Sequence, residues 1–336
     1  MNNKINKSFF KKIFHCIIAS VIPSLLISGC GASSSSQSSS SSVNILYSIC
    51  DNDDTFRSSL SDAIMSAASS NGVTVDMQLC GSDVADQLEQ ISTAKSKGYD
   101  AIIVRLTDVS TALQIEVAAN GLPLIFVNNQ PDDDRLSDNE FVYVGSDEEE
   151  AGQYQAEYVI KKLGNPSSMN VIIMEGEKGH SGTIGRTSAV KNTLKDNGVN
   201  ANYVFVDYAN WTSDGAYDMM TIFEKTGQSV DAVFCNNDTM AIGVADYLID
   251  NGATSANIIP ITGVDATSDA CAYIKEGKMS FTVLQDAATQ GTCAVLAAKA
   301  LGSGGTISSI DGATSDGKYI WVPYVPVDSS NVNNYL

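Results

Sequence analysis

Short apolar runs alternate along the chain with longer stretches in which apolar residues recur every three or four positions, from Val43 almost to the C-terminus. The short runs predict strands that are buried on both faces, and the longer stretches predict amphipathic helices. The predicted strands are 43–49, 73–79, 101–104, 124–127, 141–144, 171–174, 203–206, 232–234, 258–261 and 281–284, with a late strand at 319–327. The predicted helices are 55–70, 84–97, 110–120, 148–163, 183–197, 213–225, 239–251, 267–275 and 287–301.

Strands that alternate with helices predict parallel sheets covered by helices on both faces. The helix endings agree, because five of them close on a glycine that follows Asn or Lys, and glycine accepts the left-handed conformation of a helix cap. These glycines are Gly72, Gly98, Gly121, Gly198 and Gly252. A chain of 336 residues has room for about two domains. The predicted fold class is therefore α/β, with two doubly wound parallel-sheet lobes.

Residues 1–29 have the composition of an export signal. Four lysines precede a short apolar run, 13–27, which Pro23 interrupts and small residues follow. This order is typical of a secretory signal peptide, and the run is too short and too interrupted to span a bilayer, which needs ~20 apolar residues. Cys30 directly follows the small residues, as in a bacterial lipobox, so we expect Cys30 to be lipidated and to become the N-terminus. The alternative is an ordinary signal peptide with an incidental cysteine.

Residues 30–42 are the lipidated cysteine and an almost pure serine segment. A segment with nothing apolar to bury is predicted to be a flexible tether. The protein is therefore expected to be extracytoplasmic and anchored to the bacterial cell membrane through its lipid.

The charge of the chain excludes nucleic acid as a partner. Lys and Arg number 20 against 39 Asp and Glu, for a formal net charge of −19, and the export signal holds four of the lysines and no acid. No basic run follows residue 12. A globule this acidic repels a phosphate backbone.

The cysteines and histidines of the exported chain predict neither a metal site nor a disulfide framework. Beyond Cys30 the cysteines are odd in number and lack CxxC spacing, and His180 is the one histidine left. Cys50 and Cys80 both lie at the ends of predicted strands, so they could form a disulfide or remain two buried free thiols. Free thiols are the usual state of small buried cysteines. A Ser-His-Asp triad would have to be built on His180.

No cofactor is expected either. Neither GxGxxG nor GxxxxGK[ST] follows any of the predicted strands. The main sequence signals for binding a dinucleotide or a nucleoside triphosphate are therefore missing.

Polar and aromatic residues gather where the predicted strands end, which is where ligands bind in open α/β sheets. Amides and carboxylates, with one arginine, can pair with the hydroxyls of a sugar, and flat rings can stack on its apolar C–H faces. The candidate ligand-binding residues are Asp54, Phe56, Asn128, His180, Arg186, Trp211, Asn237, Asp265 and Gln285.

Each candidate also has an ordinary structural interpretation. Asp54, Asp238 and Asp286 stand where helix N-caps belong, and capping is the main role expected of the last two. Phe56 could be a core residue and Trp211 a helix-start anchor. The arginine could be a surface ion-pair residue and the histidine a capping donor, while Asn128, Asn237, Asp265 and Gln285 could satisfy loop backbone. Taken one at a time, these residues are weak support for a site.

Their order and spacing carry more weight. The chain resembles the type I periplasmic sugar-binding proteins over nearly everything after residue 42, and within them the galactose/glucose-binding proteins most closely. The resemblance implies that Phe56 and Trp211 stack on the sugar ring and that the other candidates bind its oxygens. The matching segments are 45–56, 126–131, 179–187, 210–211, 236–241, 263–266 and 284–287.

Three positions depart from the family pattern. Gly182 stands where the family has an aspartate that holds the anomeric hydroxyl, which leaves room for a ligand substituted there. Gln285 is one methylene longer than the family's asparagine and is similar to the ribose-binding relatives. Residues 161–168 lack the spaced carboxylates of a calcium loop, so no structural metal is expected.

The resemblance also implies two lobes joined by a three-segment hinge, with crossings near 145–147, 285–286 and 319–323. The N-terminal lobe would comprise 43–146 plus 286–320, and the C-terminal lobe 147–285 plus 321–336. A monomer is expected.

The implied function is to capture a hexose, similar to glucose or galactose, or a small glycoside, and to deliver it to the permease of an ABC importer. One alternative is a sugar sensor that presents its closed complex to a chemoreceptor or sensor kinase. Another is a hydrolase that uses Asp54 and Asp265 as a carboxylate pair. No nucleophile motif supports the hydrolase, and no DNA-binding segment supports a transcription regulator.

Overall fold

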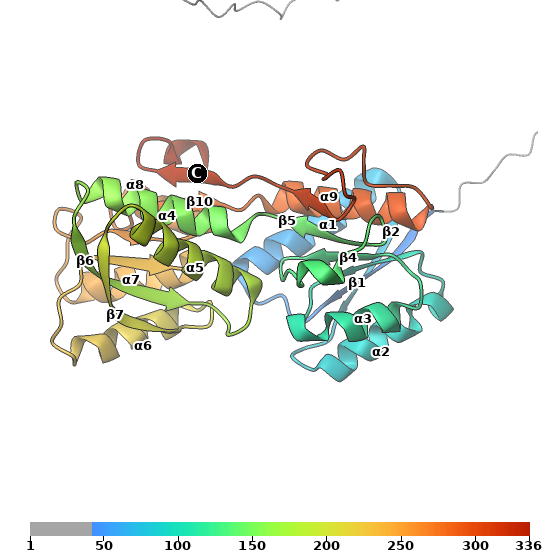
Figure 1. The fold of residues 1–336 in the computed structure, drawn as a ribbon, viewed down its shortest axis with the longest axis horizontal. Coiled ribbons are helices and arrows are strands. Elements are labelled where there is room, and N and C mark those ends of the chain that lie inside the picture. The colour runs from blue at the N-terminus through green and yellow to red at the C-terminus, as the bar shows by residue number, and fades with distance from the viewer. Residues whose placement is uncertain (1–41) are drawn as a thin grey trace, which may run out of the picture. The chain divides into compact units, whose positions relative to one another are not determined.

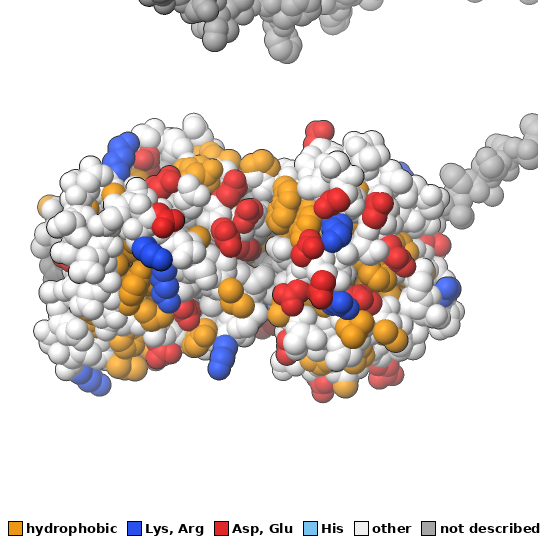
Figure 2. All heavy atoms as spheres, in the orientation of Figure 1, with side chains coloured by type: hydrophobic (Ala, Val, Ile, Leu, Met, Phe, Trp, Pro, Cys, Tyr) orange, Lys and Arg blue, Asp and Glu red, His pale blue; other side chains and the backbone are white. Residues whose placement is uncertain are grey.

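The computed structural model describes residues 42–336, which form two α/β lobes (Figure 1). The predicted signal peptide, Cys30 and the tether up to residue 41 lie outside the described residues. Within 42–336, no helix is long and apolar enough to cross a membrane. Acidic side chains are more frequent than basic ones on the face shown in Figure 2, as the composition requires.

The first lobe is built on a six-stranded parallel sheet in the order β11-β5-β4-β3-β1-β2. Its strands are β1 (Asn44–Ile49), β2 (Thr74–Leu79), β3 (Ala101–Val104), β4 (Leu124–Val127), β5 (Phe141–Gly145) and β11 (Tyr319–Trp321). Its helices are α1 (Thr55–Asn71), α2 (Val84–Ala94), α3 (Ala112–Ala119) and α9 (Ala287–Gly302), with the 3₁₀ turns η1 (Lys95–Lys97), η2 (Val109–Thr111) and η3 (Asp133–Arg135). Helices α1 and α9 lie side by side although they are far apart in the sequence (Figure 1).

The second lobe repeats this plan in the order β12-β10-β9-β8-β6-β7. Its strands are β6 (Ser168–Glu175), β7 (Asn200–Tyr208), β8 (Ala232–Cys235), β9 (Ile261–Thr262), β10 (Phe281–Leu284) and β12 (Val325–Asp328). Its helices are α4 (Glu148–Lys162), α5 (Ser181–Asp196), α6 (Ser213–Glu224), α7 (Asp238–Asp250) and α8 (Ser268–Lys275), followed by the 3₁₀ turn η4 (Val332–Asn334). The first five strands of each lobe therefore share one spatial order, and only β12 is antiparallel to its neighbour.

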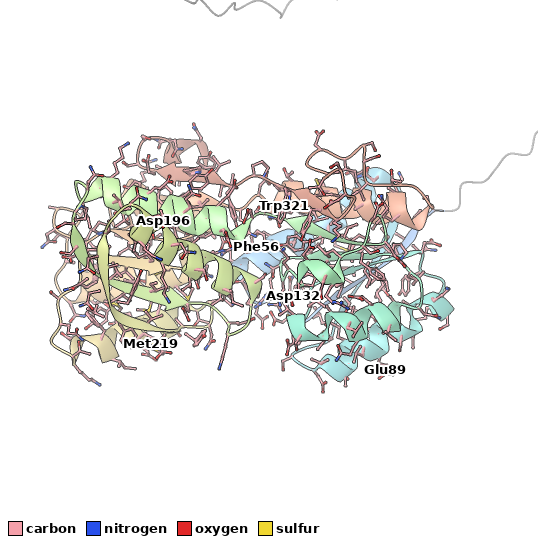
Figure 3. The ribbon with its side chains drawn as sticks, in the orientation of Figure 1. Phe56, Glu89, Asp132, Asp196, Met219 and Trp321 are labelled. Carbon is pink, nitrogen blue, oxygen red and sulfur yellow. The ribbon has the colours of Figure 1, made fainter. Side chains whose placement is uncertain are left out.

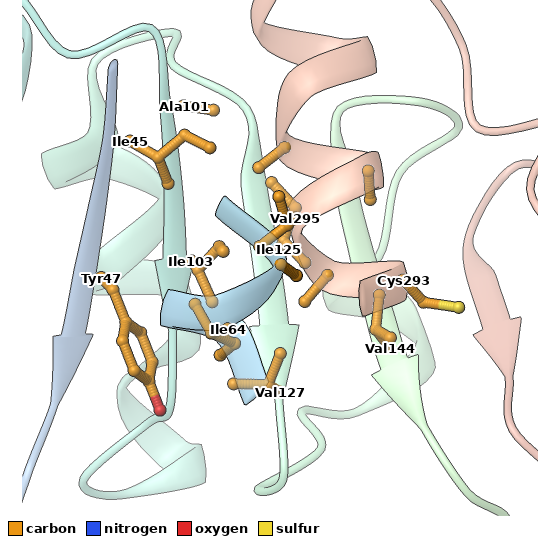
Figure 4. Packing of buried hydrophobic residues seen from close by; sticks show 14 of the residues in the cluster. Ile45, Tyr47, Ile64, Ala101, Ile103, Ile125, Val127, Val144, Cys293 and Val295 are labelled. Carbon is orange, nitrogen blue, oxygen red and sulfur yellow. The ribbon is translucent and has the colours of Figure 1, made fainter. Parts of the chain in front are cut away.

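Both faces of the central strands are buried, as their continuously apolar sequences predicted, whereas the edge strands β2 and β7 are partly exposed. In the first lobe, Ile103 of β3 and Ile125 of β4 pack against Ile64 of α1 and Val295 of α9, and all four are fully buried (Figure 4). The alternate strand residues, such as Ile102, face the cluster formed with α2 and α3. This packing fixes the carboxyl ends of the strands, from which the candidate residues project.

Local chemistry sets the helix ends. The five glycines predicted to close helices all have positive φ, for example 65° at Gly72 and 92° at Gly252. A residue with a Cβ would be strained there. The five cysteines of the described chain are buried and free, so the thiol interpretation is confirmed and the Cys50–Cys80 disulfide was wrong.

Prolines shorten two predicted strands. The predicted late strand 319–327 is broken into β11, in the first sheet, and β12, in the second. Pro323 lies in the break and has no N–H for a ladder bond. The run predicted at 258–261 forms only the two-residue β9, which begins directly after Pro260.

The chain crosses between the lobes three times. The crossings are residues 146–147 between β5 and α4, 285–286 between β10 and α9, and 322–324 between β11 and β12. The predicted lobe boundary at 320/321 falls inside β11, because Trp321 still pairs with Gly145 in the first sheet. The three crossings bring parts of the chain far apart in sequence to one place beside the cleft.

Candidate functional site

One pocket between the lobes is lined by all nine predicted ligand-binding residues. The free volume of the pocket is about 20 Å³, so the side chains of the two lobes lie close together around it. The first lobe supplies Asp54, Phe56 and Asn128, and the second supplies His180, Arg186, Trp211, Asn237 and Asp265, with Gln285 on a crossing and Arg57 as an additional lining residue. Phe56 lies where the two lobes meet (Figure 3). That these residues bind a ligand stays a prediction.

Trp211 is held in place by its surroundings. Its φ is 66°, and that of the preceding Asn210 is 52°, a left-handed backbone that is unusual for a bulky aromatic residue. The Asn237 amide donates to the Trp211 carbonyl at 3.3 Å, and a Cβ at Gly176 would overlap the indole ring. The backbone and the neighbouring residues therefore fix the ring where it lines the pocket.

Phe56 is a core residue that also lines the pocket, and its stacking on a ligand stays a prediction. It is 6% exposed, packs in the core cluster of α1 and β1, and also lines the pocket. Because it lies in the first turn of α1, its position is set by the helix rather than by a loop.

Arg186 is the most extensively bonded side chain of the pocket. It is 4% exposed. Its Nε donates to Glu148 Oε2 at 2.6 Å, its Nη2 donates to Gln285 Oε1 at 2.9 Å and to the Tyr324 hydroxyl at 3.0 Å, and its Nη1 donates to the Asn236 carbonyl at 2.6 Å. Burial alone would lower the pKa of Arg186, but Glu148, Tyr324 and Asp265 together outweigh burial, so the pKa is raised and the side chain stays charged.

His180 is neutral and caps α5. Its Nδ1 accepts from the Gly182 N–H at 3.0 Å, so His180 does cap the helix, but as an acceptor and not as the donor that the sequence analysis offered. Burial lowers the pKa of His180 well below its usual value, and Arg105 and Arg186 lower it further. Because Nδ1 accepts, the ring proton is on Nε2, which lies 3.4 Å from Asn128 Oδ1.

Arg105 is a buried residue of this region that the sequence analysis missed. It is 2% exposed and follows β3 directly. Its Nε donates to Asn128 Oδ1 at 3.3 Å and its Nη1 to Cys50 Sγ at 2.7 Å. A charged residue directly after a fully apolar strand was the signal for it in the sequence.

Glu177 joins the lobes. It follows β6 in the second lobe, and its carboxylate lies 3.1 Å from Arg105 Nη2 and 3.4 Å from Arg57 Nη1, both in the first lobe. Both arginines are buried, whereas the Glu177 side chain is 39% exposed. Nearby, the Ser181 N–H donates to Asn129 Oδ1 at 3.1 Å and the Gln130 N–H donates to Ser181 Oγ at 2.9 Å. These ion pairs and hydrogen bonds connect the two lobes directly in this structure.

Two neighbouring carboxyls have raised pKa values, Asp265 in the lining of the pocket and Asp238 close to it. Burial raises the pKa of Asp265 well above its usual value, with the nearby charge of Asp238 adding to the effect and Arg186 opposing it. Burial also raises the pKa of Asp238 to about 7, although Thr282 donates to it at 2.6 Å and the Thr267 N–H at 2.8 Å.

The capping roles differ from the prediction at one position. Asp54 and Asp286 cap α1 and α9, as the sequence suggested. Asp238 does not cap α7, and the prediction that it does was wrong. Asn237 is the cap, accepting from the Met240 N–H at 2.9 Å, and Asp238 is the first helical residue. Because the helix begins one residue earlier than predicted, the Asp238 side chain points into the protein interior.

Gln285 has an unused donor beside the pocket. Its Oε1 accepts from Arg186, while its Nε2 is buried without a partner in the described chain. A buried N–H without an acceptor costs roughly 1 to 3 kcal/mol. The amide is therefore suited to a ligand oxygen.

Comparison with known proteins agrees with this geometry. Residues 45–306 match the family described as periplasmic binding protein domain. The chain belongs to this family, the type I periplasmic sugar-binding proteins that serve as substrate-binding components of ABC transporters. Its members are binding proteins rather than enzymes, so the hydrolase alternative is set aside.

Three relatives show the breadth of the family. A putative rhizopine-binding protein of Rhizobium meliloti is 31% identical over 79% of this chain and 83% of its own length. The D-galactose/methyl-galactoside binding periplasmic protein MglB of Haemophilus influenzae is 27% identical over 74% of this chain and 78% of its own. The crystal structure of an ABC transporter solute binding protein from Bacillus halodurans with bound myo-inositol is 29% identical, with a TM-score of 0.78, over 89% of this chain and 98% of that one.

Replacing Glu177 by Gln is expected to favour the open lobes. The change keeps the shape but removes the negative charge that faces Arg57 and Arg105. Because the carboxylate is partly exposed, the pair is worth about 1 kcal/mol, so the affinity for ligand should fall about fivefold. Titration calorimetry and small-angle scattering of the unliganded protein would measure this.

The matched control for this change is Glu89→Gln, on α2 and away from the cleft (Figure 3). It should leave affinity and scattering unchanged. A Glu177→Gln protein that stays as compact and binds as tightly as the unmodified one would show that the pair does not hold the lobes together.

The contribution of Asp238 to the stability of the protein should fall as the pH rises from about 4 to about 7. The pKa of Asp238 is about 7 in the folded chain, against about 3.9 when unfolded, so the folded state binds the extra proton in this window. Asp238→Asn removes this titration, and its free energy of unfolding should vary by about 2 to 4 kcal/mol less across the window. Urea unfolding at several pH values measures both proteins, and equal slopes would contradict the assignment.

Proposed function

We propose that this protein is a lipid-anchored, extracytoplasmic substrate-binding protein that captures one hexose, similar to glucose or galactose, or a small glycoside, and delivers it to an ABC importer. The observation that carries the proposal is a pocket that residues of both lobes line, with Phe56 and Trp211 among them. Cys30 would carry the lipid, as its place after the export signal suggests.

The pocket chemistry suits a polyhydroxyl ring. Hydroxyls both donate and accept, and the pocket offers acceptors at Asp54 and Asp265 and donors at Arg186 and Gln285. Aromatic side chains from the two lobes supply apolar surface for the C–H faces of the ring. Charge-assisted bonds of this kind are strong where water is excluded.

A cyclitol of the inositol class is the second candidate. Gly182 has no side chain between His180 and Arg186, so no carboxylate at this position selects for an anomeric hydroxyl. Relatives support both classes, because one is named for galactose and methyl-galactoside and another was solved with myo-inositol. A thermal-shift panel separates them, since a ligand at 100 times its Kd stabilises by ~2.7 kcal/mol.

Binding is proposed to act by lobe closure. Only the closed form lets both lobes bond one ring, so the ligand shifts the population toward it. The permease would then recognise the closed surface of a monomer. A sensor that presents the same closed complex to a chemoreceptor or kinase is the alternative, and sugar uptake after deletion of the gene distinguishes the two.

Asp265→Ala and Arg186→Ala test the site. Each removes charge-assisted bonds to the ligand worth roughly 1.5 to 3 kcal/mol, so calorimetry should show about 10- to 100-fold weaker binding. Asp265→Ala should leave the free energy of unfolding at pH 7 unchanged or higher, because it removes a buried carboxyl whose pKa is raised. Arg186→Ala should also destabilise the fold, since Glu148 loses its partner.

The matched control is Asp196→Ala, an exposed aspartate at the far end of α5, the helix that carries Arg186 (Figure 3). It should bind like the unmodified protein. Unchanged affinity in both site variants would show that the pocket residues do not hold the ligand.

A further inference from the structure

Arg186 is bonded to all three crossings between the lobes. Glu148 follows the first crossing, Gln285 lies in the second and Tyr324 lies in the third. The three contacts are 2.6, 2.9 and 3.0 Å long. A side chain that lines the pocket is therefore tied to every segment about which the lobes would rotate.

Glu148 is the central partner in this network. It is 5% exposed, and its Oε2 accepts both from Arg186 Nε and from the Tyr324 hydroxyl, the latter at 2.7 Å. Its Oε1 is buried and has no partner in the described chain. A carboxylate this deeply buried is retained only with a close opposite charge, which Arg186 provides.

Gly182 faces the free oxygen of Glu148. A Cβ at residue 182 would lie 3.4 Å from Glu148 Oε1, 3.5 Å from Arg186 Cζ and 3.3 Å from His180 Nδ1. A side chain there would enter the space between these three groups. A carboxylate at residue 182 would therefore meet Glu148 at close range and compete with it for the same guanidinium.

From these contacts we propose that Glu148 is a positioning residue of the ligand site, whose carboxylate fixes Arg186 in the pocket and couples it to the hinge. Gly182 is required because the space beside the Arg186 guanidinium has room for one carboxylate only. The proposal rests on the proposed function, because it assigns a role to Glu148 in that same site. Glu148 acts through Arg186 and does not line the pocket itself. Its charge also raises the pKa of Arg186, which agrees with a close ion pair.

The coupling follows from the geometry of the guanidinium. The guanidinium of Arg186 is planar and rigid, so a ligand oxygen that shifts it also shifts its hydrogen bonds to Glu148, Gln285 and Tyr324. Gln285 and Tyr324 lie in two of the crossings and Glu148 directly follows the other one, so ligand binding and lobe rotation share one set of bonds. Loss of the Glu148 charge should therefore weaken binding and also reduce the closure that the ligand produces.

The test is a double-mutant cycle in the full chain with Glu148→Gln, Gly182→Asp and the two combined. Titration calorimetry with D-glucose, D-galactose and myo-inositol measures affinity, and urea unfolding without ligand measures stability. Each single change should weaken binding about 10- to 100-fold. The combined variant should bind at least about tenfold more tightly than either single one, because it again has one carboxylate beside Arg186.

Two further variants separate charge from volume and from general effects. Glu149→Gln makes the same change at the next residue, which is exposed on α4, and should bind like the unmodified protein. Gly182→Ala adds volume without charge and should lose less affinity than Gly182→Asp, since its closest contacts are 3.3 to 3.5 Å.

The outcomes are distinguishable from failure of the proposed function. If Glu148→Gln binds and closes like the unmodified protein, or the two losses simply add in the combined variant, the positioning role is wrong. If the unmodified protein binds none of the three ligands, the proposed function is wrong, and the unfolding data decide the role of Glu148. Additive losses of stability then overturn it, and rescue in the combined variant supports it.

Discussion

The structure depends on the ion pair between the buried guanidinium of Arg186 and the buried carboxylate of Glu148, whose Nε and Oε2 lie 2.6 Å apart. Neither charge is stable in the interior alone, so the two must be brought together whenever the chain folds. The Tyr324 hydroxyl and the Gln285 amide complete the arrangement. One cluster therefore connects the edge of the pocket to the segments that cross between the lobes.

Around this cluster, the two lobes contribute unlike parts. The first lobe supplies Phe56 from the start of a helix, where packing fixes the ring, and the second supplies Trp211 from a strained loop. Polar partners also come from both sides, so a ligand bonded by one lobe alone would leave buried groups unsatisfied. Glu177 gives the closed form a further contact across the cleft, which lowers the binding free energy that a ligand must supply for closure.

Much of this could be predicted from the sequence. The parallel sheets follow from uniformly apolar strands, and the placement of the nine pocket residues follows from the rule that strand ends meet at one edge. What escaped prediction depends on tertiary contacts or single-residue offsets. Arg105 meets Glu177, and Glu148 meets Arg186, only when segments far apart in the sequence come together. The capping role moved from Asp238 to Asn237 by one position, and the break at Pro323 divides one apolar run between two sheets.

The most direct measurement is a crystal structure of the protein grown with the tightest-binding member of the sugar and cyclitol panel. The ring should lie between Phe56 and Trp211, with oxygens bonded to Asp54 or Asn128 in one lobe and to Arg186 and Asp265 in the other. A ligand bound outside this pocket, or held by residues of one lobe only, would contradict the conclusion that two lobes close on a single polyhydroxyl ring.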